Sequence, residues 1–211
     1  MFENYRVFET EFAGRKISFE TGKMCALANA SILVRYGETA VLCNVTASKT
    51  PREGIDYFPL SVDFDEKLYS VGKIPGSFPR REGRPTDRAI LDSRVVDRPM
   101  RPLFPKDMRN DCAVVMSALS VDPDYPYAIC GMLGASMATA ISDIPWNGPI
   151  AGCQVALVDG EIILNPTAEQ EAKSDLHLIV SSTDKKVVMI EAGANEVDNE
   201  TMLKAIMTAH E

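Results

Sequence analysis

The sequence of 211 residues predicts an α+β fold, in which a mixed sheet carries two or three helices on one face. Three observations lead to this prediction. Apolar and polar residues alternate from residue 6 to residue 48, as in a run of antiparallel strands. Two hairpin signals occur in the last third of the chain, and three segments have helical patterns. We therefore expect an α+β rather than a doubly wound fold.

The first half of the chain predicts strands followed by a long loop. Residues 6–48 contain RVFETEF, RKISFETG, SILVRYG and ETAVLCNVTAS, with Gly14 and Gly37 where tight turns need them. Residues 49–86 are rich in proline and glycine, so they predict a loop apart from one strand at FPLSVDF. A loop of this length inside a compact domain is more often functional than idle.

A helix is expected after this loop. Thr86 is a suitable N-cap, Ile90, Leu91 and Val95 would form the apolar face, and Pro99 would end the helix. Residues 111–121 predict a strand. Residues 128–142 predict a helix so rich in Ala, Gly and Ser that another element must pack closely on it.

The remaining elements are two hairpins and a terminal helix. Residues 152–165 predict a hairpin, because Asp159-Gly160 suits a type I′ turn. Residues 174–194 predict a second hairpin, and Asp198 caps a helix over 199–210. In the SVDPDYP segment, Asp122 and Asp124 fit either a metal-binding pair or turn chemistry, and turn chemistry is favoured.

Composition excludes several functional classes. A formal net charge of -8 argues against coating nucleic acid through overall charge, so an anionic partner needs a local patch. The five cysteines lack metal-ligand spacing and predict reduced core residues, and His177 and His210 lack further ligands nearby, so no metal site is expected. Phosphate-binding glycine motifs and the serine-hydrolase elbow are absent. No stretch has a signal-peptide pattern or membrane-spanning length, so a cytoplasmic protein without a membrane partner is expected.

The local patch is an arginine cluster. Seven of the twelve arginines lie between Arg80 and Arg101, just after Phe78. Guanidinium groups bind phosphate oxygens and an aromatic ring stacks on a base, which favours binding of single-stranded nucleic acid. The alternative is that four nearby acids pair with the arginines at helical spacings. Arg94 and Arg98 share a helical stripe, with Arg101 after Pro99, which suits either an anion site or a subunit interface.

The segment KIPGSFPRREGRPTDRAILDSRVVDRPMRPLFP, with GETAVLCNVTAS and AGANEV, resembles the first core domain of bacterial polynucleotide phosphorylases. This resemblance implies a ribonuclease PH-like two-layer fold (ribosomal protein S5 domain 2-like), 3′-to-5′ phosphorolysis of RNA, a homotrimeric ring and other RNA-degradation proteins as partners. In the family, the loop carries two aromatic and two basic residues. Pro79 replaces the second aromatic here. The implied RNA-binding residues are Phe78, Arg80, Arg81, Arg94, Arg98 and Arg101.

The resemblance also implies that this core is catalytically silent. In the family, the second core holds a serine run, an aspartate and a lysine. Matching the two cores places Pro126, Tyr127 and Ala128 at the serines, His177 at the aspartate and Ile179 at the lysine. No catalytic residue is therefore expected in this chain, and magnesium is expected only at the second core.

Residues 1–197 are interpreted as one core domain, and residues 198–211 as the start of a helix that leads to a linker in a longer chain. Two other functions stay open. One is an independently active exonuclease of the ribonuclease PH type, which the missing serines disfavour. The other is a purely architectural ring subunit, which the retained arginines disfavour.

Overall fold

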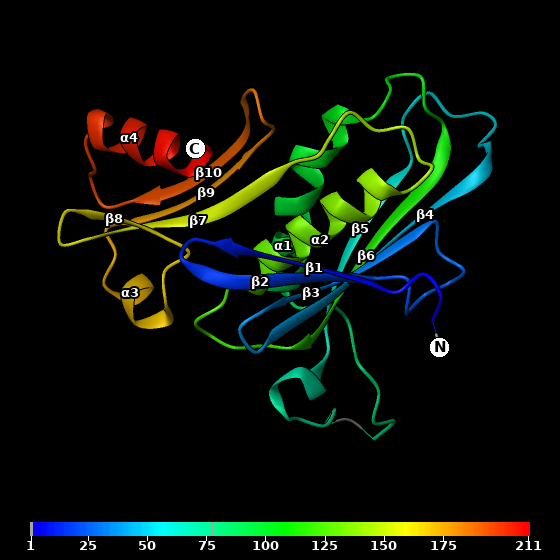
Figure 1. Cartoon of the computed structure of the whole chain (residues 1–211), viewed down its shortest axis with the longest axis horizontal. Helices are drawn as coiled ribbons and strands as arrows, with labels where there is room; N and C mark the ends of the chain where they lie inside the picture. The colour runs from blue at the N-terminus through cyan, green and yellow to red at the C-terminus, as the bar shows by residue number, and fades with distance from the viewer. Residues whose placement is uncertain (1, 77) are drawn as a thin grey trace.

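The computed structural model describes residues 2–76 and 78–211, and in this part of the chain ten strands form two sheets (Figure 1). The strands are β1 (Arg6–Phe12), β2 (Arg15–Thr21), β3 (Ala30–Tyr36), β4 (Thr39–Pro51), β5 (Leu60–Glu66), β6 (Asn110–Ser120), β7 (Ala151–Val158), β8 (Glu161–Leu164), β9 (Leu176–Ser182) and β10 (Val187–Ala194). The helices are α1 (Asp87–Met100), α2 (Tyr127–Ile141), α3 (Ala168–Ala172) and α4 (Asn199–His210), with 3₁₀ turns η1 (Leu68–Val71) and η2 (Arg101–Leu103).

The larger sheet has the strand order β1-β2-β3-β4-β6-β5. Strands β1 to β4 form consecutive antiparallel pairs, as the alternation predicts. Strand β5 pairs parallel to β6, so the sheet is mixed. The prediction of a mixed sheet is confirmed for this part of the fold.

A single sheet was the wrong expectation, because the two hairpins build a second sheet with the order β10-β9-β7-β8. The hairpin turn itself is confirmed. Asp159 and Gly160 both have positive φ, at 52° and 82°, as a type I′ turn requires. The second sheet has its own small core, which includes Val155, Leu178 and Val180.

Helix α2 joins the two sheets, since it packs on β3, β4 and β6 on one side and on β7 on the other. Close packing is visible at two glycines. A Cβ added to Gly131 would lie 2.6 Å from the Phe64 ring, and one added to Gly134 would lie 2.5 Å from Cys43 Sγ. The small residues of this helix are therefore required by its neighbours, as its composition predicts.

Helix α1 differs from its prediction in two respects. It buries Ala89, Val95, Val96, Pro99 and Met100, whereas Ile90 and Leu91 are exposed. The apolar pattern predicted the wrong buried face, because the largely buried Asp92 lies on the inner face of the helix. Pro99 does not end the helix either, because it lies in the last turn and the Arg101 N–H still bonds to the Asp97 carbonyl.

The end of the chain packs on the second sheet. Helix α4 contacts β7 and β9 and buries Ala205 in the small core, and Asp198 caps it as predicted. The continuation of this helix into a linker stays a prediction. All five cysteines are free thiols, and four are buried as expected, but Cys25 is exposed. Within residues 2–76 and 78–211, no helix combines the length and apolar character needed to cross a bilayer.

Candidate nucleic-acid interface

The arginine-rich loop of residues 72–86 connects η1 to α1 and extends away from the two sheets (Figure 1). Hydrogen bonds fix its base. The Thr86 hydroxyl donates to Glu66 Oε2 at 2.6 Å and caps α1 at the Ala89 N–H. Glu82 Oε1 accepts from the Leu68 N–H at 3.0 Å. The two limbs of the loop are thus held together next to the body, while the tip is free to meet a ligand.

The tip of this loop presents one aromatic ring and two arginines. Phe78 is fully exposed, so none of the described residues packs on its ring. Arg80 has φ +52°, an uncommon conformation for a residue with a side chain, and its guanidinium donates to the Pro75 carbonyl at 3.3 Å. Arg80 therefore helps to shape the turn that displays Phe78, and Arg81 follows it on the exposed surface.

The nearby acids do not neutralise this cluster. Among the described residues, no carboxylate forms a salt bridge with Arg80, Arg81, Arg84 or Arg94, while Arg88 lies 3.9 Å from Asp92. Glu82 bonds to backbone at the base of the loop instead. Ion pairs between residues 80 and 101 involve only some of the arginines in this interval, so the loop has a surplus of positive charge.

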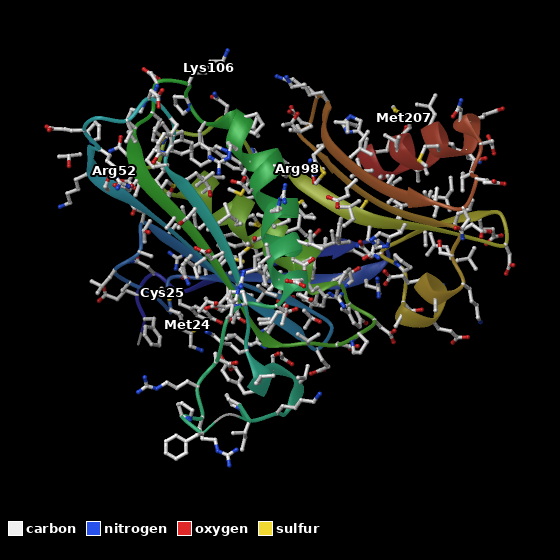
Figure 2. The ribbon with its side chains drawn as sticks, turned by 180° about the vertical axis from the view of Figure 1, so that it is seen from behind. Met24, Cys25, Arg52, Arg98, Lys106 and Met207 are labelled. Carbon is white, nitrogen blue, oxygen red and sulfur yellow. The ribbon has the colours of Figure 1, made fainter. Side chains whose placement is uncertain are left out.

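Two of the predicted arginines, Arg94 and Arg98, are exposed on α1. Arg98 Nη1 lies 3.7 Å from Glu191 Oε2 on β10, a long contact between side chains that are about half exposed. Figure 2 shows Arg98 on the outer side of α1, near the second sheet. Exposed pairs of this kind contribute little stability, so Arg98 remains able to exchange its partner for a phosphate.

Arg101 has structural bonds as well as a predicted RNA contact. Its guanidinium donates to both oxygens of Asp97, at 2.6 and 3.1 Å, and to the carbonyls of Leu60 at 3.1 Å and Phe58 at 3.4 Å. These bonds connect the end of α1 to the start of β5. Most of the donors of Arg101 are therefore used inside the protein.

We expect Arg101→Ala to lower the free energy of unfolding by about 1–2 kcal/mol, because it removes the bidentate partner of Asp97 and the donor to the Leu60 carbonyl. Arg94→Ala removes an exposed side chain without such bonds, and it should change stability by less than about 0.5 kcal/mol. Urea unfolding of both variants measures the difference. Equal stability of the two variants would show that the Arg101 bonds contribute nothing.

The predicted residues form two groups rather than one patch. Phe78, Arg80 and Arg81 lie in the loop that precedes α1, whereas Arg94 and Arg98 lie in the second half of that helix. At 1.5 Å per residue, Arg98 is roughly 18 Å along the helix axis from Thr86. A single strand that touches both groups must therefore span several nucleotides.

The positions matched to a second-core active site do lie together. Pro126, Tyr127, Ala128, His177 and Ile179 line one pocket of about 500 Å³ at the start of α2. Helix α2 begins without a side-chain cap, and the Tyr127 hydroxyl points to Glu66 at 2.6 Å. The pocket is therefore present. Pro126 and Ala128 have no hydroxyl group, the hydroxyl of Tyr127 is bonded to Glu66, and Ile179 has no amino group.

Glu171 is the residue of this pocket that sequence reasoning missed. Its Oε1 lies 3.2 Å from Nδ1 of His177, and the Gln154 amide lies 3.4 Å from the same nitrogen. Glu171 belongs to the short helix α3, which begins with a capping box of Thr167 and Gln170. That Thr-x-x-Gln pattern was the available sequence signal.

Arg15 packs against Tyr125, one of the residues that line this pocket. The Arg15 guanidinium lies 4.9 Å from the Tyr36 ring centroid and 4.6 Å from that of Tyr125, and it donates to the Asp124 carbonyl. Asp122 Oδ1 accepts from the Asp124 N–H. The two aspartates thus form a turn, which confirms the prediction of turn chemistry in this segment. Burial raises the pKa of Asp92 at the pocket edge, and the Glu66 and Glu191 charges add to this effect.

Both the sequence and the fold of this chain are similar to those of known proteins. Residues 13–145 match the 3′ exoribonuclease family, domain 1, and residues 148–211 match the 3′ exoribonuclease family, domain 2. The fold resembles the crystal structure of rice (Oryza sativa) Rrp46, with a TM-score of 0.73 and 14% identity over 92% of this chain and 86% of that one.

Curated relatives named polyribonucleotide nucleotidyltransferase are also similar. The protein of Heliobacterium modesticaldum is 56% identical over 206 residues, which is 98% of this chain and 29% of the relative. That of Clostridioides difficile is 56% identical over all 211 residues, 30% of its own length. The chain spans less than a third of these relatives. It belongs to the 3′ exoribonuclease family and has a ribonuclease PH-like α+β fold.

Proposed function

We propose that this chain is the first core of a polynucleotide phosphorylase, a 3′-to-5′ phosphorolytic exoribonuclease, and that it guides single-stranded RNA and helps to build a homotrimeric ring. The identity to polyribonucleotide nucleotidyltransferases over the whole chain supports the family assignment. The observation that carries the RNA-guiding role is the exposed loop tip, where the fully exposed Phe78 lies next to Arg80 and Arg81, for which the described residues provide no salt bridge.

The chemistry of this tip favours single strands without base specificity. A guanidinium group binds phosphate oxygens, which every nucleotide offers, and a phenyl ring stacks on any base. Double-stranded RNA keeps its bases paired and stacked, so it offers no free base face to Phe78. Arg94, Arg98 and Arg101 would contact the backbone further along the same strand.

The phosphorolysis reaction would take place in another core of the proposed enzyme, not in this chain. The pocket at the start of α2 has no serine or lysine at the matched positions, and the Tyr127 hydroxyl is bonded to Glu66. We infer that inorganic phosphate is activated in a second core, where magnesium would offset the charge on the transferring phosphoryl group. Action in the cytoplasm and contact with other RNA-degradation proteins are part of the same proposal.

The RNA-guiding role is tested by removing the exposed ring of Phe78 and measuring RNA affinity. Phe78→Ala should weaken binding of single-stranded RNA by about 1–3 kcal/mol, or roughly fivefold to 150-fold, because one base loses its stacking partner. Pro79 offers no second aromatic ring to compensate. Fluorescence anisotropy with labelled oligo(A) and oligo(U) measures the affinities.

A matched control is Phe8→Ala, since Phe8 is 56% exposed on β1 and lies outside the loop. This variant should bind RNA as the parent does. If Phe78→Ala changes affinity by less than twofold, or if Phe8→Ala weakens binding equally, the loop tip does not hold a base.

A further inference from the structure

A second hollow, of about 430 Å³, lies at the base of the arginine-rich loop. One side is formed by η1 and the other by residues 82–86, where the loop returns to α1. Figure 1 shows these two limbs side by side below the larger sheet. Since ligand pockets typically measure about 300–1,000 Å³, this hollow suits a small ligand.

The inner wall of the hollow is apolar. Phe64, Ala89, Val121 and Tyr127 line it, and the rings of Phe64 and Tyr127 meet at 5.5 Å between centroids. The outer wall includes Val71, whose side chain is 53% exposed. An apolar inner wall of this kind favours a ligand with a flat apolar surface over a hydrated ion.

The rim carries three acids and three bases, and each of the three acids already accepts a hydrogen bond within the protein. Glu66 accepts from both Tyr127 and Thr86, Glu82 accepts from the Leu68 N–H, and Asp65 accepts from Lys67. By contrast, the described residues offer Arg84 no hydrogen bond or ion pair. The rim therefore favours a ligand with hydrogen-bond acceptors.

The planar guanidinium group of Arg88 lies over the Tyr127 ring on the inner wall of the hollow. Its guanidinium carbon lies 5.2 Å from the centroid of the Tyr127 ring, and its Nε lies 3.9 Å from Asp92, beyond hydrogen-bond distance. A guanidinium in this position can donate to ring nitrogens and carbonyl oxygens of a planar ligand and also stack on it.

We propose that this hollow binds a nucleobase. A base has flat apolar faces for the inner wall and edge acceptors for Arg84 and Arg88, and with its ribose it is of the size that the hollow admits. Balanced rim charges disfavour a ligand that is only an anion, such as free phosphate. The base would come from a free nucleotide or from the RNA strand, and only the second source rests on the proposed function.

The experiment is a titration of the 211-residue chain with adenosine 5′-monophosphate, followed by two-dimensional NMR, with ribose 5-phosphate as the comparison. We expect saturable binding of the nucleotide and at least tenfold weaker binding of the sugar phosphate. Val71→Trp should fill the hollow and weaken nucleotide binding at least tenfold. Tyr69→Trp, on the same 3₁₀ turn but outside the hollow, should stay within twofold of the parent.

A second variant fills the hollow from the opposite wall. Gly83→Trp has open space around its new Cβ and should weaken nucleotide binding as Val71→Trp does. The proposal is wrong if the nucleotide does not bind saturably, if ribose 5-phosphate binds equally well, or if neither folded filling variant weakens binding. Circular dichroism of each variant identifies those that fold.

Competition separates the two sources of the base. If oligo(A) displaces the nucleotide and Val71→Trp also weakens oligo(A) binding, the base belongs to the strand. If both ligands bind at once, the hollow binds a free nucleotide. The nucleotide titration of the filling variants measures the hollow, and the comparison of Phe78→Ala with the parent measures the loop tip, so a failure of the hollow and a failure of the loop in RNA binding give different results.

Discussion

Incubated with 3′-labelled single-stranded RNA, phosphate and magnesium, the isolated 211-residue chain is expected to release no nucleoside diphosphates. Phosphorolysis needs a phosphate held in line with the terminal linkage and a metal that offsets developing charge. The pocket at the start of α2 has Pro126 and Ala128 in place of hydroxyl groups, and Ile179 in place of a lysine. Residues 2–76 and 78–211 contain no cluster of three His, Cys, Asp or Glu side chains suited to a metal.

Glu171 and His177 form a candidate pair for residual chemistry in this pocket, because Glu171 Oε1 lies 3.2 Å from His177 Nδ1. Glu171→Ala is therefore the informative control. Release of diphosphates by the parent chain that disappears in Glu171→Ala would establish an independent exonuclease of the ribonuclease PH type. Asp175 lies two residues before His177 and offers a second carboxylate next to the matched aspartate position. Release that survives both Glu171→Ala and Asp175→Ala would show that the matching of the two cores is wrong.

Replacing both loop arginines is expected to produce the largest loss of RNA affinity. Arg80→Ala with Arg81→Ala removes two guanidinium groups from the loop tip, and we expect affinity for oligo(A) and oligo(U) to fall alike, by about tenfold to a hundredfold. The slope of log affinity against log salt should fall by roughly 0.7 for each lost phosphate contact, hence by about 1.4 in the double variant.

The matched control removes the same charge elsewhere. Arg6 lies on β1, and Arg52 pairs with Asp111 at 3.2 Å on the far side from the second sheet (Figure 2). Arg6→Ala with Arg52→Ala should leave the salt slope unchanged. If the two double variants lose affinity equally, general charge rather than the loop attracts the RNA.

Local patterns predicted most of the elements correctly, because each depends on neighbouring residues. Strand alternation gave the antiparallel pairs β1 to β4, the Asp159-Gly160 turn gave the β7–β8 hairpin, and Thr86 gave the start of α1. Each of these signals arises from backbone conformation or capping within a few residues.

Features that depend on tertiary packing were not predictable in this way. Local sequence does not tell which strands share a sheet, so the second sheet was missed. The buried Asp92 interrupts the inner face of α1, and its environment comes from Glu66 and Tyr127 on other elements. The roles of Arg98 and Arg101 likewise depend on Glu191 and on two carbonyls near β5, which are distant in sequence.

Photo-cross-linking tests the RNA-guiding role most directly. A single strand that contains 4-thiouridine would be bound to the 211-residue chain, irradiated and digested, and the modified peptides identified by mass spectrometry. The account predicts that the main cross-link lies in the peptide that contains Phe78, and that Phe78→Ala removes it while Phe8→Ala does not. Cross-links confined to other surfaces, with the loop unmodified, would contradict the assignment of this loop as the RNA contact.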